Sequence, residues 1–145
     1  MATYFADTSF WIGLSSKRDQ HHRRAVSWHQ FVIRTRSTIL TTEAVLLEWL
    51  NALSDVSTRR IAAESYMRVR ADMRIEVAPF QAELMAAAID LYRGRPDKNW
   101  SLTDCLPFVV VGRRGIVEAL TTDHDFAQAG LQALMLAEPG VSTGS

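Results

Sequence analysis

The sequence predicts an α/β fold with a central, mostly parallel sheet of four to five strands. Short apolar or β-branched runs alternate along the chain with longer segments in which apolar residues recur at helical spacing. This alternation is typical of sheets whose parallel strands are joined by helices. The chain has 145 residues without internal repeats or a linker, which is the length of one domain and enough to bury a core.

The predicted strands are brief runs of apolar or β-branched residues. The first is followed by Asp7 and the fourth by Asp123. Runs this short, bounded by polar residues, are typical of buried strands. The segments are residues 3–6, 37–41, 75–77, 117–122 and, as a last strand, 131–136.

The predicted helices carry an apolar stripe, or capping residues at their ends. Thr41 or Thr42 suits the cap of the helix that runs to Leu53, and Gly115 suits the end of the helix that Ser101 opens. The other helical segments are one that starts around residues 10–14 with Thr8 or Ser9 as cap, 19–36, 58–73, one with Pro79 in its first turn and an apolar stripe up to Leu91, and a short helix or turn after Asp123.

The cysteine content and the hydropathy pattern predict a protein of the reducing cytoplasm. The single cysteine, Cys105, excludes an internal disulfide and a multi-cysteine zinc site. No signal peptide is expected, because the first residues reach Asp7 before any long apolar run, and no stretch approaches the roughly 18 residues of a membrane span. We expect residues 1–137 to form one domain and residues 138–145, with their Pro, Gly and Ser, to form a flexible tail.

The charge balance argues against nucleic-acid binding through bulk electrostatics, because 16 basic and 16 acidic side chains give a net charge of zero. The arginines nevertheless occur in clusters. Most clusters fit solvated helix faces, and one or two could flank a phosphate path. They are Arg23-Arg24, Arg34 with Arg36, Arg59-Arg60, Arg68 with Arg70, Arg93 with Arg95, and Arg113-Arg114.

Two acids follow predicted strands, where α/β proteins bind their ligands. Asp7 comes after the first strand and Asp123 after the fourth. The carboxyl ends of parallel strands share one rim of the sheet, and ligands bind beyond that rim. Each aspartate has an alternative interpretation as a helix cap or an Asx turn.

Two further acids lie on predicted helices. Glu48 interrupts an apolar helix past its first turn, where an unpaired carboxylate is costly in apolar surroundings. Alternatively, Glu48 and Asn51 mark an exposed polar seam. Asp104 lies in the first turn of a helix that should start near the same rim, but it also fits a capping box with Ser101 or a favourable place in the helix dipole.

Four carboxylates on one rim would repel one another strongly if no cation bound them. Their hard oxygen atoms suit Mg²⁺ or Mn²⁺. Zinc is a poorer fit because no histidine lies beside three of the acids, and His124 is the exception. The sequence therefore predicts a catalytic site with one or two metal ions, formed by Asp7, Glu48, Asp104 and Asp123.

Four segments resemble, in order, the motifs of PIN-domain nucleases. Each contains an acid at the position of the family's acid, and in the fourth segment both Asp123 and Asp125 fit that position, with Asp123 directly after the strand. The segments are residues 5–9 (Phe-Ala-Asp-Thr-Ser), 41–49 with Glu48, 100–105 with Asp104, and 120–126. The resemblance extends from Tyr4 to about Leu136, and by size the nearest members are VapC-type toxins of bacterial toxin–antitoxin pairs.

That resemblance implies a PIN-like three-layer α/β/α fold and an endoribonuclease that uses Mg²⁺ or Mn²⁺. It also implies a homodimer held inactive by a cognate antitoxin. A metal-activated water would cleave RNA to leave a 5′-phosphate and a 3′-hydroxyl. Thr8, Ser9 or Thr103 could hydrogen-bond a water in such a site.

Alternative functions remain open at this point. The same acids suit a PIN-fold nuclease of DNA or RNA outside toxin–antitoxin systems, or a phosphatase, because contact with the RNA 2′-hydroxyl has no sequence signature. A catalytically silent nucleic-acid-binding module would have lost an acid, and none is missing. A phosphoacceptor receiver domain needs a lysine at the rim, whereas Lys17 and Lys98 lie in loop-like segments. The four tryptophans are expected in the core and not as base-stacking platforms.

Overall fold

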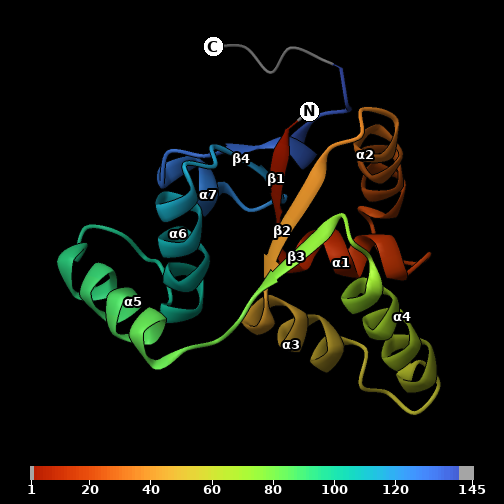
Figure 1. Ribbon diagram of the computed structural model, residues 1–145, viewed down its shortest axis with the longest axis horizontal. Helices are drawn as coiled ribbons and strands as arrows, with labels where there is room; N and C mark the ends of the chain where they lie inside the picture. Colours follow the sequence, from red (N-terminus) through yellow and green to blue (C-terminus); the bar gives the residue numbers. More distant parts are fainter. Residues whose placement is uncertain (1, 141–145) are drawn as a thin grey trace.

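All five strands lie parallel in a single sheet (Figure 1). The computed structural model describes residues 2–140, and within them the strand order is β3-β2-β1-β4-β5. In the middle of the sheet Phe5 pairs with Leu40 on one side and with Ala119 on the other. The strands are β1 (Thr3–Ala6), β2 (Thr38–Thr42), β3 (Ile75–Ala78), β4 (Glu118–Leu120) and β5 (Gln132–Ala133). The predicted parallel sheet of four to five strands is confirmed.

Helices flank this sheet, as the prediction of an α/β/α arrangement requires. In Figure 1, α1 to α4 gather to one side, and α5 to α7 lie on the other, where α5 packs along α6. The helices are α1 (Thr8–Ser15), α2 (His22–Arg34), α3 (Glu43–Ala52), α4 (Arg59–Ala71), α5 (Ala82–Gly94), α6 (Leu102–Arg114), α7 (His124–Gln128) and the 3₁₀ turn η1 (Leu134–Leu136).

The strand order makes β1 the point at which the chain changes direction across the sheet. From β1 the chain moves outward to β2 and β3, and then returns to the other side of β1 with β4 and β5. Ligand sites of open α/β sheets form beyond the carboxyl ends of the strands at such a switch point. Asp7 directly follows β1 and Asp123 closely follows β4. The fold therefore brings the two predicted acids to this position.

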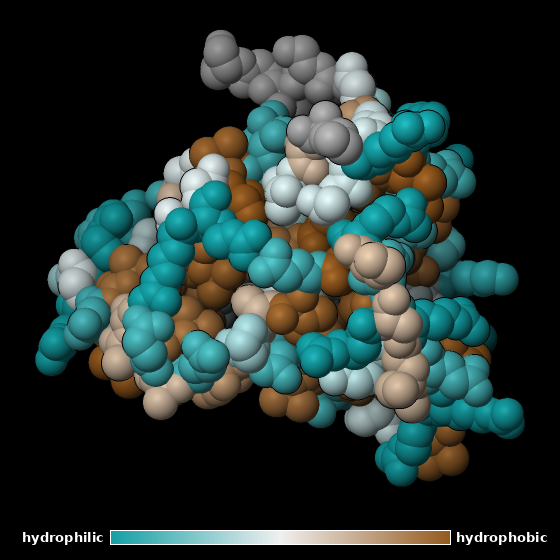
Figure 2. Space-filling view, in the orientation of Figure 1, coloured by the Kyte–Doolittle hydropathy of each residue, from teal (hydrophilic) through white to brown (hydrophobic). Residues whose placement is uncertain are grey.

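The core is aromatic and aliphatic, and all four tryptophans belong to it. Trp11, Trp28, Trp49 and Trp100 are buried. The rings of Trp11 and Trp49 lie 5.6 Å apart, and Trp11 Nε1 donates to the hydroxyl of Thr41 at 3.2 Å. On the outside, Figure 2 shows hydrophobic side chains in the middle of one face and hydrophilic ones around its edge. The tryptophans are core residues, as predicted.

Several helix ends have the predicted caps. Thr42 Oγ1 accepts a hydrogen bond from the N–H of Val45 at 3.0 Å and caps α3. Gly115 ends α6 with a φ of 65°, a left-handed conformation that favours glycine. At α1, by contrast, Asp7 is the N-cap residue, so Thr8 and Ser9 lie inside the first turn.

Two predicted boundaries are wrong because backbone groups find partners outside the expected element. Pro79 does not begin a helix: α5 starts at Ala82, and the N–H of Phe80 donates to Glu43 Oε1 at 2.7 Å. That hydrogen bond holds the segment between β3 and α5 against α3. The fourth strand ends at Leu120, because the carbonyl of Thr121 accepts from the N–H of Met135 at 3.1 Å in η1.

The last described residues pack against α2. Glu138 forms an ion pair with Arg24 at 2.9 Å, and Trp28 Nε1 donates to the carbonyl of Ala137 at 2.9 Å. The last strand has only two residues, because residues 134–136 continue as the turn η1. Residues 141–145 of the predicted tail lie outside the described residues. Among the helices of residues 2–140, none combines the length and the apolar character of a bilayer-spanning segment.

Candidate metal centre

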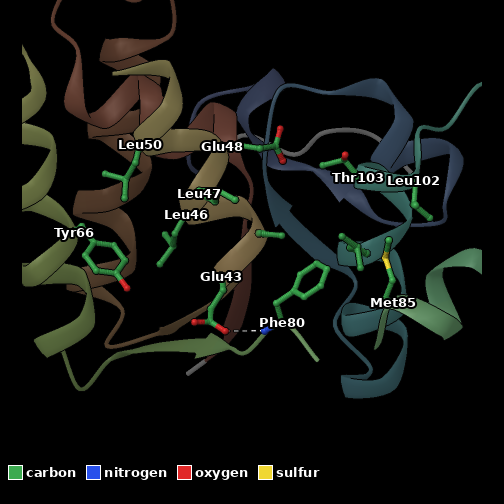
Figure 3. A pocket seen from close by; sticks show the side chains of 12 residues that line it. Glu43, Leu46, Leu47, Glu48, Leu50, Tyr66, Phe80, Met85, Leu102 and Thr103 are labelled. Carbon is green, nitrogen blue, oxygen red and sulfur yellow. Dashed lines mark hydrogen bonds between the residues drawn. The ribbon is translucent and has the colours of Figure 1, made fainter. Parts of the chain in front are cut away.

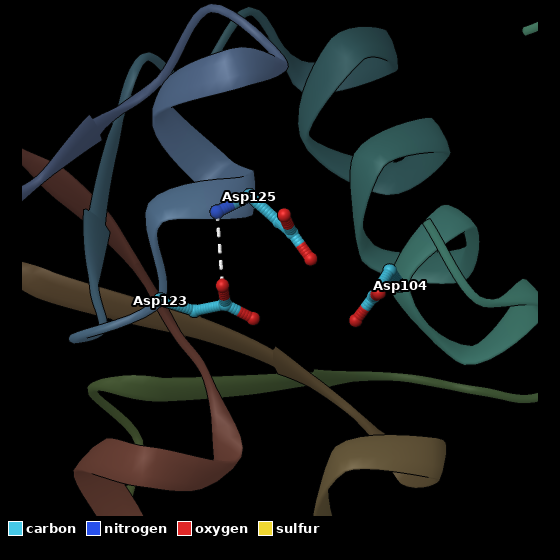
Figure 4. A group of neighbouring side chains, drawn as sticks. All are labelled: Asp104, Asp123 and Asp125. Atoms are coloured by element: carbon cyan, nitrogen blue, oxygen red, sulfur yellow. Dashed lines mark hydrogen bonds between the residues drawn. The ribbon is translucent and has the colours of Figure 1, made fainter. Parts of the chain in front are cut away.

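Three aspartates form a compact group at the carboxyl end of the sheet (Figure 4). Each of Asp104, Asp123 and Asp125 offers a carboxylate oxygen, and these oxygens lie within 4.8 Å of one another. Asp104 comes from the first turn of α6, Asp123 is the N-cap residue of α7, and Asp125 lies in the first turn of α7. Figure 4 shows the side chains of Asp104 and Asp125 directed toward one another across a gap.

Asp104 caps its own helix and also belongs to this group. The hydroxyl of Ser101 accepts from the N–H of Asp104, and Asp104 Oδ2 accepts from the N–H of Ser101, both at 3.0 Å. The capping box that served as the alternative interpretation is thus present. It fixes the carboxylate at the start of α6 and leaves the second oxygen without a capping role.

The fourth motif, residues 120–126, contributes both Asp123 and Asp125 to the group, whereas the sequence favours Asp123 alone. Asp123 Oδ1 accepts from the N–H of Asp125 at 2.9 Å, so this carboxylate also caps a helix. Burial raises the pKa of Asp125, and the charges of Asp123 and Asp104 raise it further. Asp125 is therefore as much a part of the group as Asp123.

Asp7 lies at the end of β1, outside the group of three but in electrostatic contact with it. Burial raises its pKa from 3.8 to about 6, opposed by hydrogen bonds from the Thr8 backbone and the Thr121 side chain. The charges of Glu48 and Asp123 also contribute to this increase in the pKa. Thr121 Oγ1 donates to Asp7 Oδ2 at 2.9 Å. Asp7 thus retains affinity for a proton close to neutral pH.

Glu48 faces the site from α3, but its surroundings are not the apolar ones that the sequence suggested. The side chain is exposed, like that of Asn51, so the polar-seam interpretation describes its burial better. This is because the face of α3 with Glu48 borders the site, while Leu46 and Trp49 fill the core. Loss of hydration still raises the pKa of Glu48, as does the charge of Asp104.

The donor set fits a hard divalent cation. Asp104, Asp123 and Asp125 provide only carboxylate oxygens, which suit Mg²⁺ or Mn²⁺ better than softer metals. His124 is exposed and does not belong to the group. The Thr8 hydroxyl is buried and has no well-formed hydrogen bond to the described residues, although its proximity to Glu48 lowers the pKa of that carboxyl. A water or ligand oxygen in the site would give this hydroxyl a partner.

Thr121 organises one side of the site, although its sequence pattern predicts only a strand residue. Its side chain is fully buried, donates to Asp7 and lies 3.3 Å from the hydroxyl of Ser9. The Thr121 Oγ1 also accepts from the N–H of Asp123 at 3.1 Å. The available signal is the position of this polar residue at the end of an apolar strand, close to Asp123. A β-branched threonine there is equally typical of the strand itself, so the pattern does not reveal its role in the site.

An apolar groove of about 590 Å³ adjoins the acids (Figure 3). Glu48 and Thr103 lie at one end of it, and Glu43 and Phe80 lie at the opposite end. Its apolar lining comes mainly from α3, α5 and α6, and Leu47 and Phe80 in it are exposed. Thr103, a candidate for holding a water, lines this groove and does not belong to the group of three aspartates.

Comparison with known proteins agrees with this architecture. Residues 4–131 match the PIN domain. The chain is 28% identical over 126 residues to VapC20, a 23S rRNA-specific endonuclease, from two strains of Mycobacterium tuberculosis; the match covers 87% of this chain and 93% of VapC20. The crystal structure of M. tuberculosis VapC20, a sarcin–ricin loop cleaving toxin, aligns with a TM-score of 0.77 and 26% identity, over 90% of this chain and 98% of that chain.

The matched region includes every acid of the site, from Asp7 to Asp125. It also contains β2 to β4 and β1 from Tyr4 onward, and the order of these strands creates the switch point. The likeness to VapC20 extends over nearly all of both chains. The chain belongs to the PIN-domain family.

Proposed function

We propose that this protein is a metal-dependent endoribonuclease and the toxin of a toxin–antitoxin pair, with one catalytic domain in residues 1–137. The observation that carries the proposal is the group of Asp104, Asp123 and Asp125, with oxygens within 4.8 Å of one another. Similarity to VapC20, a 23S rRNA-specific endonuclease, supports RNA as the substrate and ribosomal RNA as the first target to test. We expect the protein to act in the cytoplasm.

In this proposal Asp104, Asp123 and Asp125 hold Mg²⁺ or Mn²⁺, and Asp7 and Glu48 complete the site directly or through water. When bound, the cation makes water a stronger nucleophile at neutral pH and stabilises negative charge on the phosphoryl oxygens. The capping bonds of Asp104 and Asp123 keep their carboxylates in place without further reorganisation. Thr121 orients Asp7 in the same way.

The decisive experiment is a cleavage assay with an RNA hairpin of the sarcin–ricin loop sequence and with total ribosomal RNA. Purified protein should cleave RNA with Mg²⁺ or Mn²⁺ and leave 5′-phosphate ends, whereas EDTA should abolish cleavage. Activity that persists in EDTA, or 2′,3′-cyclic phosphate ends, would refute the metal-dependent mechanism. Cleavage of DNA at an equal rate would favour a PIN-fold nuclease outside toxin–antitoxin systems.

Expression without a partner should slow bacterial growth, and Asp7→Ala should relieve the effect, because the site would lose an acid. The measurement is growth after induction, with immunoblots to show equal amounts of soluble protein. Normal growth with abundant wild-type protein would contradict a toxin function. Relief by co-expression of the cognate antitoxin, and a homodimer by light scattering, are the further expectations of the proposal.

A catalytically silent nucleic-acid-binding module is the second candidate. It would bind RNA without cleaving it under any metal condition. The complete set of acids argues against it, because their mutual repulsion is costly in a protein that binds no cation.

A further inference from the structure

A second cleft, whose lining includes two arginines, one glutamate, several polar residues and two apolar ones, lies next to the acidic site. Its volume is about 620 Å³. It lies between the start of α2, the connection from β4 to α7 and the last described residues. Its lining includes Arg23, Arg24, Thr122, Met135 and Glu138. None of its lining residues belongs to the apolar groove.

Thr122 connects this basic cleft to the acids. It lines the cleft and directly precedes Asp123 in the chain. Its N–H donates to Ser9 Oγ at 3.2 Å, and Ser9 lies 3.3 Å from the hydroxyl of Thr121, which donates to Asp7. One wall of the cleft therefore belongs to the hydrogen-bonded network that positions Asp7, so the cleft and the acidic site are immediate neighbours.

The two arginines of the cleft differ in their engagement. Arg24 is held by Glu138 Oε1 and by the carbonyl of Met135, each at 2.9 Å, and its guanidinium keeps further N–H donors. Arg23 is exposed and makes no hydrogen bond or ion pair with any residue in the described part of the chain. The cleft thus offers one fixed and one unpaired guanidinium.

The start of α2 adds to this positive character. The helix has 13 residues, and no side chain caps its first turn. The N–H of His22 donates to the carbonyl of Asp19 at 3.0 Å, so only the next N–H groups of this turn lack a partner among the described residues. Aligned peptide dipoles place partial positive charge at such an end. The carboxylate of Asp19, which accepts from the N–H of His21 at 2.9 Å, offsets part of this positive charge. The two guanidinium groups therefore provide the main match to the charge and the geometry of phosphate groups.

RNA needs such a path because the acids of the site repel its backbone. The net charge of the chain is zero, so no general attraction compensates for this repulsion, and binding has to come from local cations. The basic cleft is the cationic surface that directly adjoins the acids through Thr122.

We propose that the basic cleft binds the phosphate backbone of the RNA strand beside the scissile bond, with Arg23 and Arg24 as its phosphate ligands. The inference rests on the proposed ribonuclease function and adds the path of the substrate. It makes Arg23 a substrate-positioning residue that acts on binding and not on the chemical step.

The test uses Arg23→Gln, which removes an exposed charge, with Arg34→Gln as the matched control. Arg34 is exposed at the other end of the same helix and makes no ion pair with the described residues. Steady-state cleavage of the ribosomal RNA hairpin should show an increase of about ten-fold in KM for Arg23→Gln with unchanged kcat, and no change for Arg34→Gln.

A binding measurement separates this inference from the proposed catalysis. Fluorescence anisotropy with a labelled single-stranded RNA, in the Asp104→Asn background, should show weaker binding for Arg23→Gln. The slope of log affinity against log salt concentration should fall by about 0.7 for the lost phosphate contact. Absence of cleavage by the wild type would refute the proposed function, while this binding comparison would still decide the role of the cleft.

Equal losses for Arg23→Gln and Arg34→Gln would overturn the inference, because they would indicate a general charge effect. Unchanged RNA binding by Arg23→Gln would also overturn it. If this variant bound RNA normally but escaped inhibition by the cognate antitoxin in the growth assay, the cleft would be a protein-binding surface instead.

Discussion

Asp104→Asn should reduce RNA cleavage by at least about a hundred-fold and leave the fold intact. Loss of groups that merely support metal ligands costs 10- to 100-fold, so loss of a direct ligand should cost at least the upper value. The amide oxygen of asparagine can still accept from the N–H of Ser101, which keeps the capping bond that Asp104 makes at 3.0 Å. The substitution therefore separates the cap from the metal site.

Cleavage rates at saturating Mg²⁺ test this expectation, and circular dichroism melts test the fold. Asp90→Asn is the matched control, because Asp90 is exposed on α5 and, among residues 2–140, its one ion pair is with Arg93. Near-normal cleavage by Asp104→Asn would show that the carboxylate is a cap and no more. A large loss for Asp90→Asn would reveal that the assay responds to surface charge.

Asp7→Asn should stabilise the metal-free protein at pH 8 by on the order of 3 kcal/mol. The folded protein raises the pKa of Asp7 from 3.8 to about 6, and every tenfold change in proton affinity corresponds to about 1.4 kcal/mol. A raised pKa favours folding below the unfolded value, near pH 4, and this contribution is lost as the pH rises through 6. The side chain of Asp7 ionises in this range in the wild type, whereas the amide of the Asp7→Asn variant does not. The variant should therefore become more stable than the wild type as the pH rises from 4 to 7.

Urea denaturation in EDTA at several pH values provides the measurement. The difference between variant and wild type should be small at pH 4 and reach its full size above pH 7. Added Mg²⁺ or Mn²⁺ should stabilise the wild type, by about 2.7 kcal/mol at a hundred times the dissociation constant, and the variant by less. A variant that is less stable at pH 8, together with no effect of metal, would contradict an acidic cluster around Asp7.

The sequence was sufficient for the order of the elements, because each strand and helix has its own local pattern. Interactions between distant segments explain the two wrong boundaries, at the start of α5 and at the end of β4. Pro79 has the local properties of a first helical turn, but Glu43 on α3 binds the next residue and keeps the connection extended. Thr121 has the β-branched character of a strand residue, but it turns to Asp7 and η1 instead.

The sequence predicts the acids of the site, but the surroundings of Glu48 and the role of Asp125 differ from the prediction. Glu48 was chosen as a carboxylate in apolar surroundings, whereas it is exposed at the edge of the site. Asp125 was only an alternative to Asp123, because spacing along the chain does not reveal that both face Asp104. Proximity of that kind depends on where α6 begins relative to α7, which no local pattern encodes.

The pairing of β1 with β4 determines when, during synthesis, the site can exist. Phe5 and Ala6 pair with Ala119 and Leu120, which are separated from them by most of the chain. A nascent chain that has reached the end of α5 contains Asp7 and Glu48 but lacks α6, β4 and the three aspartates. Contacts between such distant segments form late, after the closure of long loops. A ribosome must therefore synthesise at least residues 1–125 before the chain contains every acid of the site.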